Sequence, residues 1–175
     1  YREARGDLVL FTDADTRHGP ELLGRAVGAL ESERRDLVTV IGRMICGSFW
    51  ERVIMPIIGA LLAIRFHPTA VNRARRASEA IANGQFILVT RESYEAVGTH
   101  AAVKHEVAED LALAQLYFRA GRPQLFAFGL RLLGTRMYTS LAGLVEGWSK
   151  NVYVGGRRSY PDEPVLRALI PVMFA

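Results

Sequence analysis

The sequence contains little cysteine, no strong excess of one charge and no long apolar run. Its single cysteine, Cys46, excludes an internal disulfide framework and does not indicate a metal cluster. The 22 Lys and Arg residues against 18 Asp and Glu give a net charge of +4, which suits nucleotide phosphates or anionic lipid as well as nucleic acid. No repeat, signal-like segment or linker divides the 175 residues, so one domain is expected.

The longest apolar run lies between Arg52 and Arg65 and covers residues 53–64. As a helix it would span about 18 Å, well short of the roughly 30 Å of bilayer hydrocarbon. It is therefore not expected to cross a membrane. Two interpretations remain, namely a helix in the membrane interface with Trp50 at headgroup level, and a buried core helix that Pro56 would kink.

Both ends of the chain lie inside apparently longer segments, so we expect a piece of a longer protein. Residues 1–156 are interpreted as the C-terminal part of one domain. Residues 157–175 are interpreted as a linker and the start of an apolar membrane helix. A turn is predicted at residues 155–158, where two glycines precede two arginines.

Apolar runs alternate with helical stripes along the chain, which is typical of an α/β fold with a mostly parallel sheet and flanking helices. A basic segment at 67–82 is interpreted as a loop or surface helix. The expected strands cover residues 7–12, 37–41, 86–89, 125–128 and 130–133. The expected helices cover residues 20–30, 49–66, 91–97 and 105–120, with another beginning at 139 or 140.

Asp13 and Asp15 directly follow the first predicted strand. In an extended chain these two side chains point to the same side, at the sheet end where ligands bind in open α/β sheets. Their oxygens suit Mg²⁺ or Mn²⁺ bridging to nucleotide phosphates. A loop with an Asp-capped turn explains the same residues equally well.

Later segments complete a family pattern. Residues 11–15, 83–86 and 107–110 resemble, in order, the Asp-x-Asp motif, the cleft segment and the Glu-Asp motif of family-two inverting glycosyltransferases of GT-A fold. Residues 146–151 resemble the helix that carries the Gln-x-x-Arg-Trp motif of membrane-associated members. The resemblance extends from Gly6 to about Gly156.

The resemblance implies a role for each matching residue. Asp15 would hold the divalent metal, with Asp13 on the ribose or on a metal-bound water. Asp110 would be the catalytic base, with Glu109 the weaker candidate. A further set would contact the nucleotide sugar or acceptor: Asn83, Gly84, Gln85 and Trp148. For Trp148 a place in the core of an amphipathic helix remains an equal alternative.

The last motif departs from the family pattern, because Leu144 and Gly147 stand where Gln and Arg are expected. This argues against a processive polymerase and favours resemblance to enzymes that glycosylate hopanoid, carotenoid or ceramide-type lipids. Implied partners are a nucleotide-sugar donor, a lipid or membrane-linked acceptor and a membrane surface, without nucleic acid. The implied location is a membrane, as in the bacterial inner membrane, with the site facing the cytoplasm.

Several basic residues have weaker interpretations. Lys150, Arg157 and Arg158 are candidates for holding diphosphate, although solvated surface positions explain them more simply. His105 is interpreted as a helix-start residue rather than a metal ligand.

Two other function classes remain open. A haloacid-dehalogenase-like phosphatase also begins with Asp-x-Asp, but Arg17 stands where that family needs Thr or Val, and Thr16 comes one residue early. A non-catalytic membrane-peripheral domain would use the apolar helix and basic loops, but its acidic pairs would not help it bind anionic lipid.

The family's base-reading first half would precede Tyr1, so this chain alone is expected to bind sugar nucleotides weakly or not at all. Calorimetry with uridine and guanosine diphosphate sugars plus Mn²⁺ measures this. Tight binding would contradict the expectation.

Overall fold

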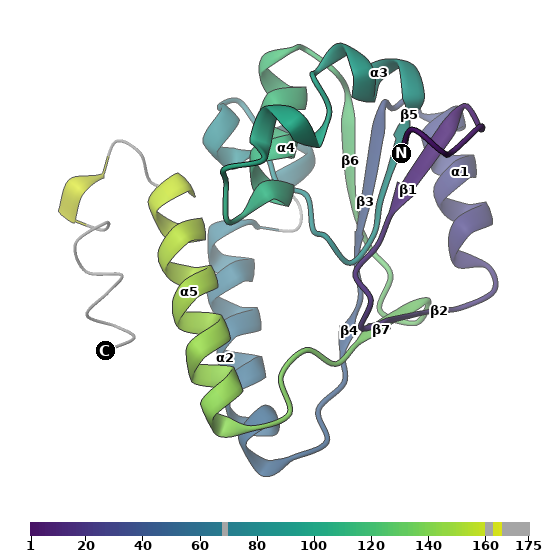
Figure 1. Ribbon diagram of the computed structural model, residues 1–175. Helices are drawn as coiled ribbons and strands as arrows, with labels where there is room; N and C mark the ends of the chain where they lie inside the picture. The colour runs from purple at the N-terminus through teal and green to yellow at the C-terminus, as the bar shows by residue number, and fades with distance from the viewer. Residues whose placement is uncertain (68–69, 160–162, 166–175) are drawn as a thin grey trace.

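A computed structural model describes residues 1–67, 70–159 and 163–165 (Figure 1). The helices are α1 Leu22–Ser32, α2 Phe49–Arg65, α3 Arg91–Ala96, α4 Glu109–Arg119 and α5 Leu141–Ser159. The strands are β1 Leu8–Phe11, β2 Thr16–His18, β3 Leu37–Ile41, β4 Arg43–Met44, β5 Ile87–Thr90, β6 Gln124–Phe128 and β7 Leu133–Thr135. Residues 166–175 lie outside the described residues, so the expected membrane helix is not tested.

The main sheet has the strand order β1-β5-β3-β6. Strands β1 and β3 both pair antiparallel with β5, whereas β3 and β6 are parallel. Three of the four strands therefore point the same way, and β5 runs against them. The α/β architecture with flanking helices is confirmed, and the mostly parallel direction holds except at β5. A smaller sheet with the order β2-β7-β4 lies beside it.

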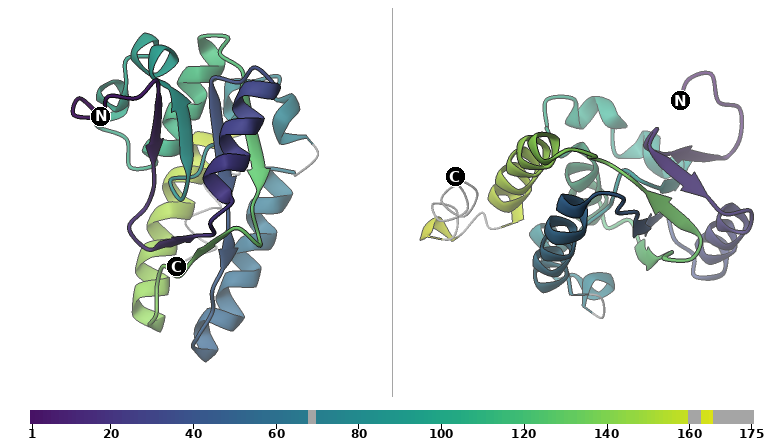
Figure 2. Two further views of the ribbon diagram at one scale, coloured as in Figure 1. Left: turned by 90° about the vertical axis from the view of Figure 1, so that its right-hand side faces the viewer. Right: turned by 90° about the horizontal axis from the view of Figure 1, so that it is seen from below.

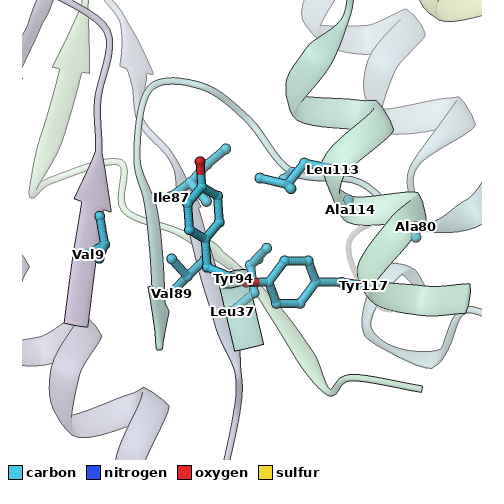
Figure 3. Packing of buried hydrophobic residues seen from close by; sticks show 10 residues of the cluster. Val9, Leu37, Ala80, Ile87, Val89, Tyr94, Leu113, Ala114 and Tyr117 are labelled. Carbon is cyan, nitrogen blue, oxygen red and sulfur yellow. The ribbon is translucent and has the colours of Figure 1, made fainter. Parts of the chain in front are cut away.

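Helices cover both faces of the main sheet, which explains why its strands are apolar on both sides. Helices α1 and α4 lie on opposite sides of the strands (Figure 1). On the α4 face, the core includes Val9, Leu37, Val89, Tyr94 and Tyr117 (Figure 3). The core of the α1 face contains Leu22, Ala26, Leu30, Val38, Val40, Phe86, Leu88 and Leu133.

Helices α2 and α5 pack side by side, away from the main sheet (Figure 2). Met55 and Ile58 of α2 contact Leu144 and Trp148 of α5 in a separate apolar core. Ser48 begins α2 with a capping box, in which its hydroxyl accepts the N–H of Glu51 and Glu51 accepts the N–H of Ser48. Among the described residues, no helix combines the length and hydrophobicity that crossing a bilayer requires.

Glu51 also joins the helix pair to the small sheet. Its carboxylate is 1 % exposed and receives two hydrogen bonds from Arg136, at 2.9 and 3.0 Å. Arg136 directly follows β7, so this ion pair connects the start of α2 to the end of that strand. The hydrogen bonds from Arg136 and Ser48 hold the pKa of Glu51 far below its ordinary value.

Three predicted boundaries are wrong. Helix α4 begins at Glu109 and not at residue 105, because Ala108 has non-helical dihedrals. Strand β7 begins at Leu133 and not at residue 130, because residues 129–132 form a turn closed by hydrogen bonds to the Gly129 carbonyl. The turn expected at 155–158 is helical, since α5 continues to Ser159.

Packing explains the longer helix α5. One side of α5 carries an apolar residue every four positions, at Leu144, Trp148 and Val152. All three belong to the apolar core that α5 shares with α2. A helical glycine costs about 1 kcal/mol relative to alanine, which this packing offsets at positions 155 and 156. The other predicted strands and helices are found within a few residues of their expected bounds.

Replacing Glu51 with Gln is expected to lower the melting temperature by several degrees at neutral pH, because the charged pair with Arg136 is lost. The folded-state pKa is depressed, so the stabilisation is present above the ordinary value of 4.5 and is lost as the pH falls below it. The difference between wild type and Glu51→Gln should therefore narrow on acidification, which thermal unfolding by circular dichroism measures.

Glu21→Gln is the matched control. Glu21 pairs with Arg25 at 2.7 Å on α1, but both side chains are more than 60 % exposed, so its loss should change little. Equal melting temperatures for Glu51→Gln and wild type at every pH would show that the ion pair between Glu51 and Arg136 does not stabilise the protein.

Candidate active site

The backbone of Gly84 connects two carboxylate residues that are 97 positions apart in the sequence. The N–H of Gly84 donates to Oδ2 of Asp110 at 3.1 Å. Its carbonyl accepts the N–H of Asp13 at 3.0 Å. The end of β1, the turn before β5 and the start of α4 therefore meet at one residue, as the sequence predicted for these three segments.

Gly84 also leaves room for the Asp13 side chain. A Cβ atom at this position would lie 3.0 Å from Oδ1 and 3.3 Å from Oδ2 of Asp13. Those distances are shorter than ordinary van der Waals contacts, so any larger residue would move the carboxylate. The absence of a side chain at residue 84 thus permits the Asp13 carboxylate to lie against the Gly84 backbone.

Asn83 and Gln85 have structural contacts on either side of Gly84. The Asn83 side chain accepts the N–H of Gln85 at 2.9 Å, and the Asn83 N–H donates to the buried hydroxyl of Thr39. Gln85 is 3 % exposed, and its side-chain oxygen accepts the N–H of Gly42 at 3.0 Å. These contacts fix the turn, and donor contact by the two side chains stays a prediction.

Asp110 occupies the first turn of α4, together with Glu109. Helix N-termini favour negative charge, and Asp110 also accepts the N–H of Leu111 at 2.7 Å. Burial nevertheless raises the pKa of Asp110 above its ordinary value, and the charges of Glu109 and Asp13 add to the shift. The two backbone hydrogen bonds oppose it. Asp110 is thus a carboxylate with increased proton affinity, whereas Glu109 is exposed.

Like charges gather around Asp13. Partial burial and the carboxylates of Asp15 and Glu109 raise the pKa of Asp13. The Asp15 side chain is exposed, and its carbonyl accepts a hydrogen bond from Thr135 of β7 at 3.4 Å. The Asp-x-Asp loop therefore lies between the two sheets, and its two carboxylates repel each other.

A divalent cation fits this group of carboxylates, because it would relieve their repulsion and prefers oxygen ligands. Within the described part of the chain, no group of three or more Asp, Glu, His or Cys residues is placed to hold a metal. Mg²⁺ sites at phosphates commonly use one or two carboxylates and complete the shell with phosphate and water oxygens. Asp13 and Asp15 match that donor set.

Trp148 lies in the core between α2 and α5 and not beside the carboxylates. It is 7 % exposed, and its indole N–H donates to the sulfur of Met55 at 3.2 Å. The position of Trp148 therefore matches the alternative of a core tryptophan. Contact with a sugar or acceptor stays an untested prediction.

The remaining weak candidates lie outside the carboxylate group. Lys150 is exposed on α5, and the side chains of Arg157 and Arg158 are outside the described residues. His105 is exposed in the turn before α4, so its expected position within the helix is wrong.

A polar network beside Asp13 was missed in the sequence. The Thr12 hydroxyl contacts the Thr16 hydroxyl at 2.9 Å, Nε2 of His18 at 3.0 Å and the Gln85 carbonyl at 3.0 Å. Thr12 precedes Asp13 directly, so the network orders the Asp-x-Asp loop. The only sequence signal for this network was Thr12, which directly precedes the Asp-x-Asp motif. Nothing in the local pattern singles out His18.

His100 was also missed. Its ring lies 4.6 Å from that of Phe11, and its Nδ1 lies 2.6 Å from the hydroxyl of Tyr94. Burial lowers the pKa of His100, and the charge of Glu109 opposes this shift. His100 therefore supports the end of β1 from the side on which α4 begins.

A comparison with protein families now bears on this geometry. The model of Glycosyl transferase family 21 matches residues 1–172. The chain belongs to this family. The resemblance to glycosyltransferases is confirmed, the family number is corrected from two to 21, and the phosphatase interpretation is wrong. No curated protein matches the sequence.

A solved structure shows the same fold. The mannosyltransferase PcManGT from Pyrobaculum calidifontis, solved with GDP-Man and Mn²⁺, aligns with a TM-score of 0.58 at 18 % identity, covering 97 % of this chain and 46 % of that one. Mannosyl-3-phosphoglycerate synthase from Rubrobacter xylanophilus aligns at 0.47 and 21 % identity, covering 89 % and 46 %. The alignment with PcManGT shows that the family 21 chain has a GT-A fold. The chain spans about half the length of both structures.

Asp110→Asn is expected to raise the melting temperature at neutral pH. The folded-state pKa of Asp110 is raised, so ionised Asp110 lowers stability progressively as the pH rises above the ordinary value of 3.8. The gain from Asp110→Asn should be small near pH 3.8 and should grow toward neutral pH, which thermal melts across that range measure.

Asp7→Asn is the matched control for this effect, because Asp7 is an exposed aspartate outside the carboxylate group. Its melting temperature should follow the wild type. A neutral-pH melting temperature that is lower for Asp110→Asn than for wild type would contradict a destabilising ionised Asp110.

Proposed function

We propose that the protein transfers a sugar from a nucleotide diphosphate sugar to the hydroxyl of a lipid or membrane-linked acceptor, with inversion and with Mg²⁺ or Mn²⁺. The observation that carries this proposal is the meeting of Asp13 and Asp110 at Gly84. It brings the Asp-x-Asp loop and a carboxylate of raised pKa to one end of the sheet. Membership of a glycosyltransferase family gives the reaction class.

Asp13 and Asp15 would hold the metal at the donor diphosphate. A bound divalent cation supplies positive charge where negative charge develops on the leaving phosphate. Asp13 and Asp15 would supply the carboxylate oxygens that bind this cation. Gly84 holds the Asp13 backbone by accepting its N–H and leaves space for its carboxylate. The Thr135 hydroxyl holds the Asp15 backbone by donating to the Asp15 carbonyl.

Asp110 would take the proton from the acceptor hydroxyl as that oxygen attacks the anomeric carbon. A base works best when its pKa lies near the working pH, and burial moves the pKa of Asp110 in that direction. The N–H groups of Gly84 and Leu111 orient the carboxylate. A single base that activates the acceptor for direct displacement supports inversion.

The acceptor class rests on the sequence and on the exposed apolar surface of α2. The departure at Leu144 and Gly147 favours a lipid acceptor over a growing polysaccharide. The exposed apolar side of α2 supports a membrane location. The structural relative from Pyrobaculum calidifontis was solved with GDP-Man and Mn²⁺, which supports a nucleotide-sugar donor and a divalent metal.

That apolar side also supports a second candidate, a non-catalytic membrane-peripheral domain. Such a domain would gain nothing from carboxylates whose mutual repulsion raises the pKa of Asp13. A transferase needs them together. The two candidates therefore differ in whether Asp110 contributes to turnover.

Asp110→Asn in the intact protein is expected to reduce kcat by about 10² to 10⁴-fold while nucleotide-sugar binding persists, because only the proton acceptor is removed. Glu109→Gln, which removes the exposed neighbour, should lose much less activity. Hydrolysis and transfer from several sugar nucleotides, with calorimetry for binding, provide the measurements.

Asp7→Asn again serves as the control and should keep wild-type turnover. Undiminished turnover in Asp110→Asn would exclude Asp110 as the base. A wild-type protein that binds vesicles but turns over none of the donors would favour the peripheral-domain alternative.

A further inference from the structure

Helix α2 carries an apolar stripe on the side that faces away from the protein. At 100° per residue, the stripe occupies about 100° of the helix circumference along its whole length. Its large residues, with their exposed fractions, are Phe49 (69 %), Trp50 (45 %), Val53 (40 %), Ile57 (57 %) and Ile64 (76 %). We refer to these five residues as the α2 stripe.

The opposite side of the helix is already used for packing. Met55 and Ile58 are at least 93 % buried against α5, and Glu51 is buried at the start of the helix. Helix α2 is therefore apolar on its outer side as well as on its inner side. Contiguous exposed apolar surface of this kind is unusual in soluble proteins and marks a contact surface.

After Glu51, the charged residues of α2 and of the segment that follows it are basic as far as Glu79. Residues 52–78 contain five arginines and neither Asp nor Glu. Arg52 is exposed beside the stripe, and Arg73, Arg75 and Arg76 are exposed in the segment that follows the helix. An exposed apolar stripe with Arg52 beside it and a basic segment after the helix is complementary to lipid tails below a layer of anionic headgroups.

We propose that the α2 stripe lies flat in the surface of an anionic lipid bilayer. The 17-residue helix is about 25 Å long, and its polar start is fixed to the protein through Glu51, so it lies along the surface and does not cross it. Trp50 suits the headgroup level, and arginine side chains reach phosphates while their stems cover apolar surface.

The geometry connects this surface to the candidate active site. Glu51 in the first turn of α2 binds Arg136, and the preceding residue, Thr135, donates to the carbonyl of Asp15. The bilayer contact and the Asp-x-Asp loop are thus linked through β7. The inference rests on the proposed function for the nature of the acceptor. It identifies the α2 stripe as the surface through which the protein would reach a lipid acceptor.

The test is flotation of the full chain with vesicles of equal parts phosphatidylcholine and phosphatidylglycerol. No turnover is needed, so failure here is distinguishable from failure of the proposed transferase activity. The chain should float with the vesicles, and Trp50 should be quenched by brominated acyl chains while the buried Trp148 is shielded. Ile57→Glu should lower the apparent partition coefficient about tenfold or more.

Leu23→Glu is the matched control. Leu23 is 50 % exposed on α1, outside the stripe, so the same change of an apolar residue to Glu should leave binding unaltered. Val53→Glu provides a second stripe variant should Ile57→Glu fail to fold, as judged by circular dichroism. Reversing Arg75 and Arg76 to Glu should weaken binding and reduce its dependence on salt.

Two results would overturn the proposal. The first is that wild-type protein does not float, or that the folded stripe variants float as well as wild type. The other is self-association that shields Trp50 without lipid and disappears in Ile57→Glu, which would identify a second copy of the chain as the occupant of the stripe.

Discussion

Gly84 uses both of its backbone polar groups to connect segments that are distant in the sequence, and the arrangement of the candidate site depends on these two hydrogen bonds. The N–H orients Asp110, and the carbonyl positions the backbone of Asp13. Thr39 of β3 holds the neighbouring Asn83, so the turn is fixed to the central sheet. The Asp13 backbone and the Asp110 carboxylate are therefore tied to the sheet, which suits the precise positioning that the proposed catalysis would need.

This arrangement has an electrostatic cost. Asp13, Asp15, Glu109 and Asp110 repel one another, and burial adds to the cost for Asp110. The start of α4 and two backbone N–H groups reduce this cost but do not remove it, since the pKa of Asp110 remains raised. A fold under selection for stability alone would separate these groups. Their proximity supports the proposed cation site and proton transfer, because the fold alone does not require it.

The sequence predicted much of the fold and the residues at the centre of the site, because both leave local patterns. Apolar runs located the strands of the main sheet, and the Asp-x-Asp and Glu-Asp pairs located the two acidic segments. The reversed direction of β5, the function of Gly84 as a bridge and the position of His18 depend on contacts between remote segments, which leave no periodic pattern. The role of Trp148 could not be decided from the sequence for the same reason, since a tryptophan in the core and one that stacks on a sugar have the same local sequence pattern.

The orientation of helix α2 could not be predicted from the sequence either. A helix that is apolar on all sides has no preferred rotation about its own axis, because any face can enter the core. Glu51 removes this freedom. Its carboxylate satisfies the Ser48 N–H and binds Arg136, so only one rotation places it correctly. Met55 and Ile58 then face α5, and the α2 stripe faces outward. We infer that this buried charged residue, which adds nothing to the hydrophobicity of the helix, determines which of its apolar faces is left exposed.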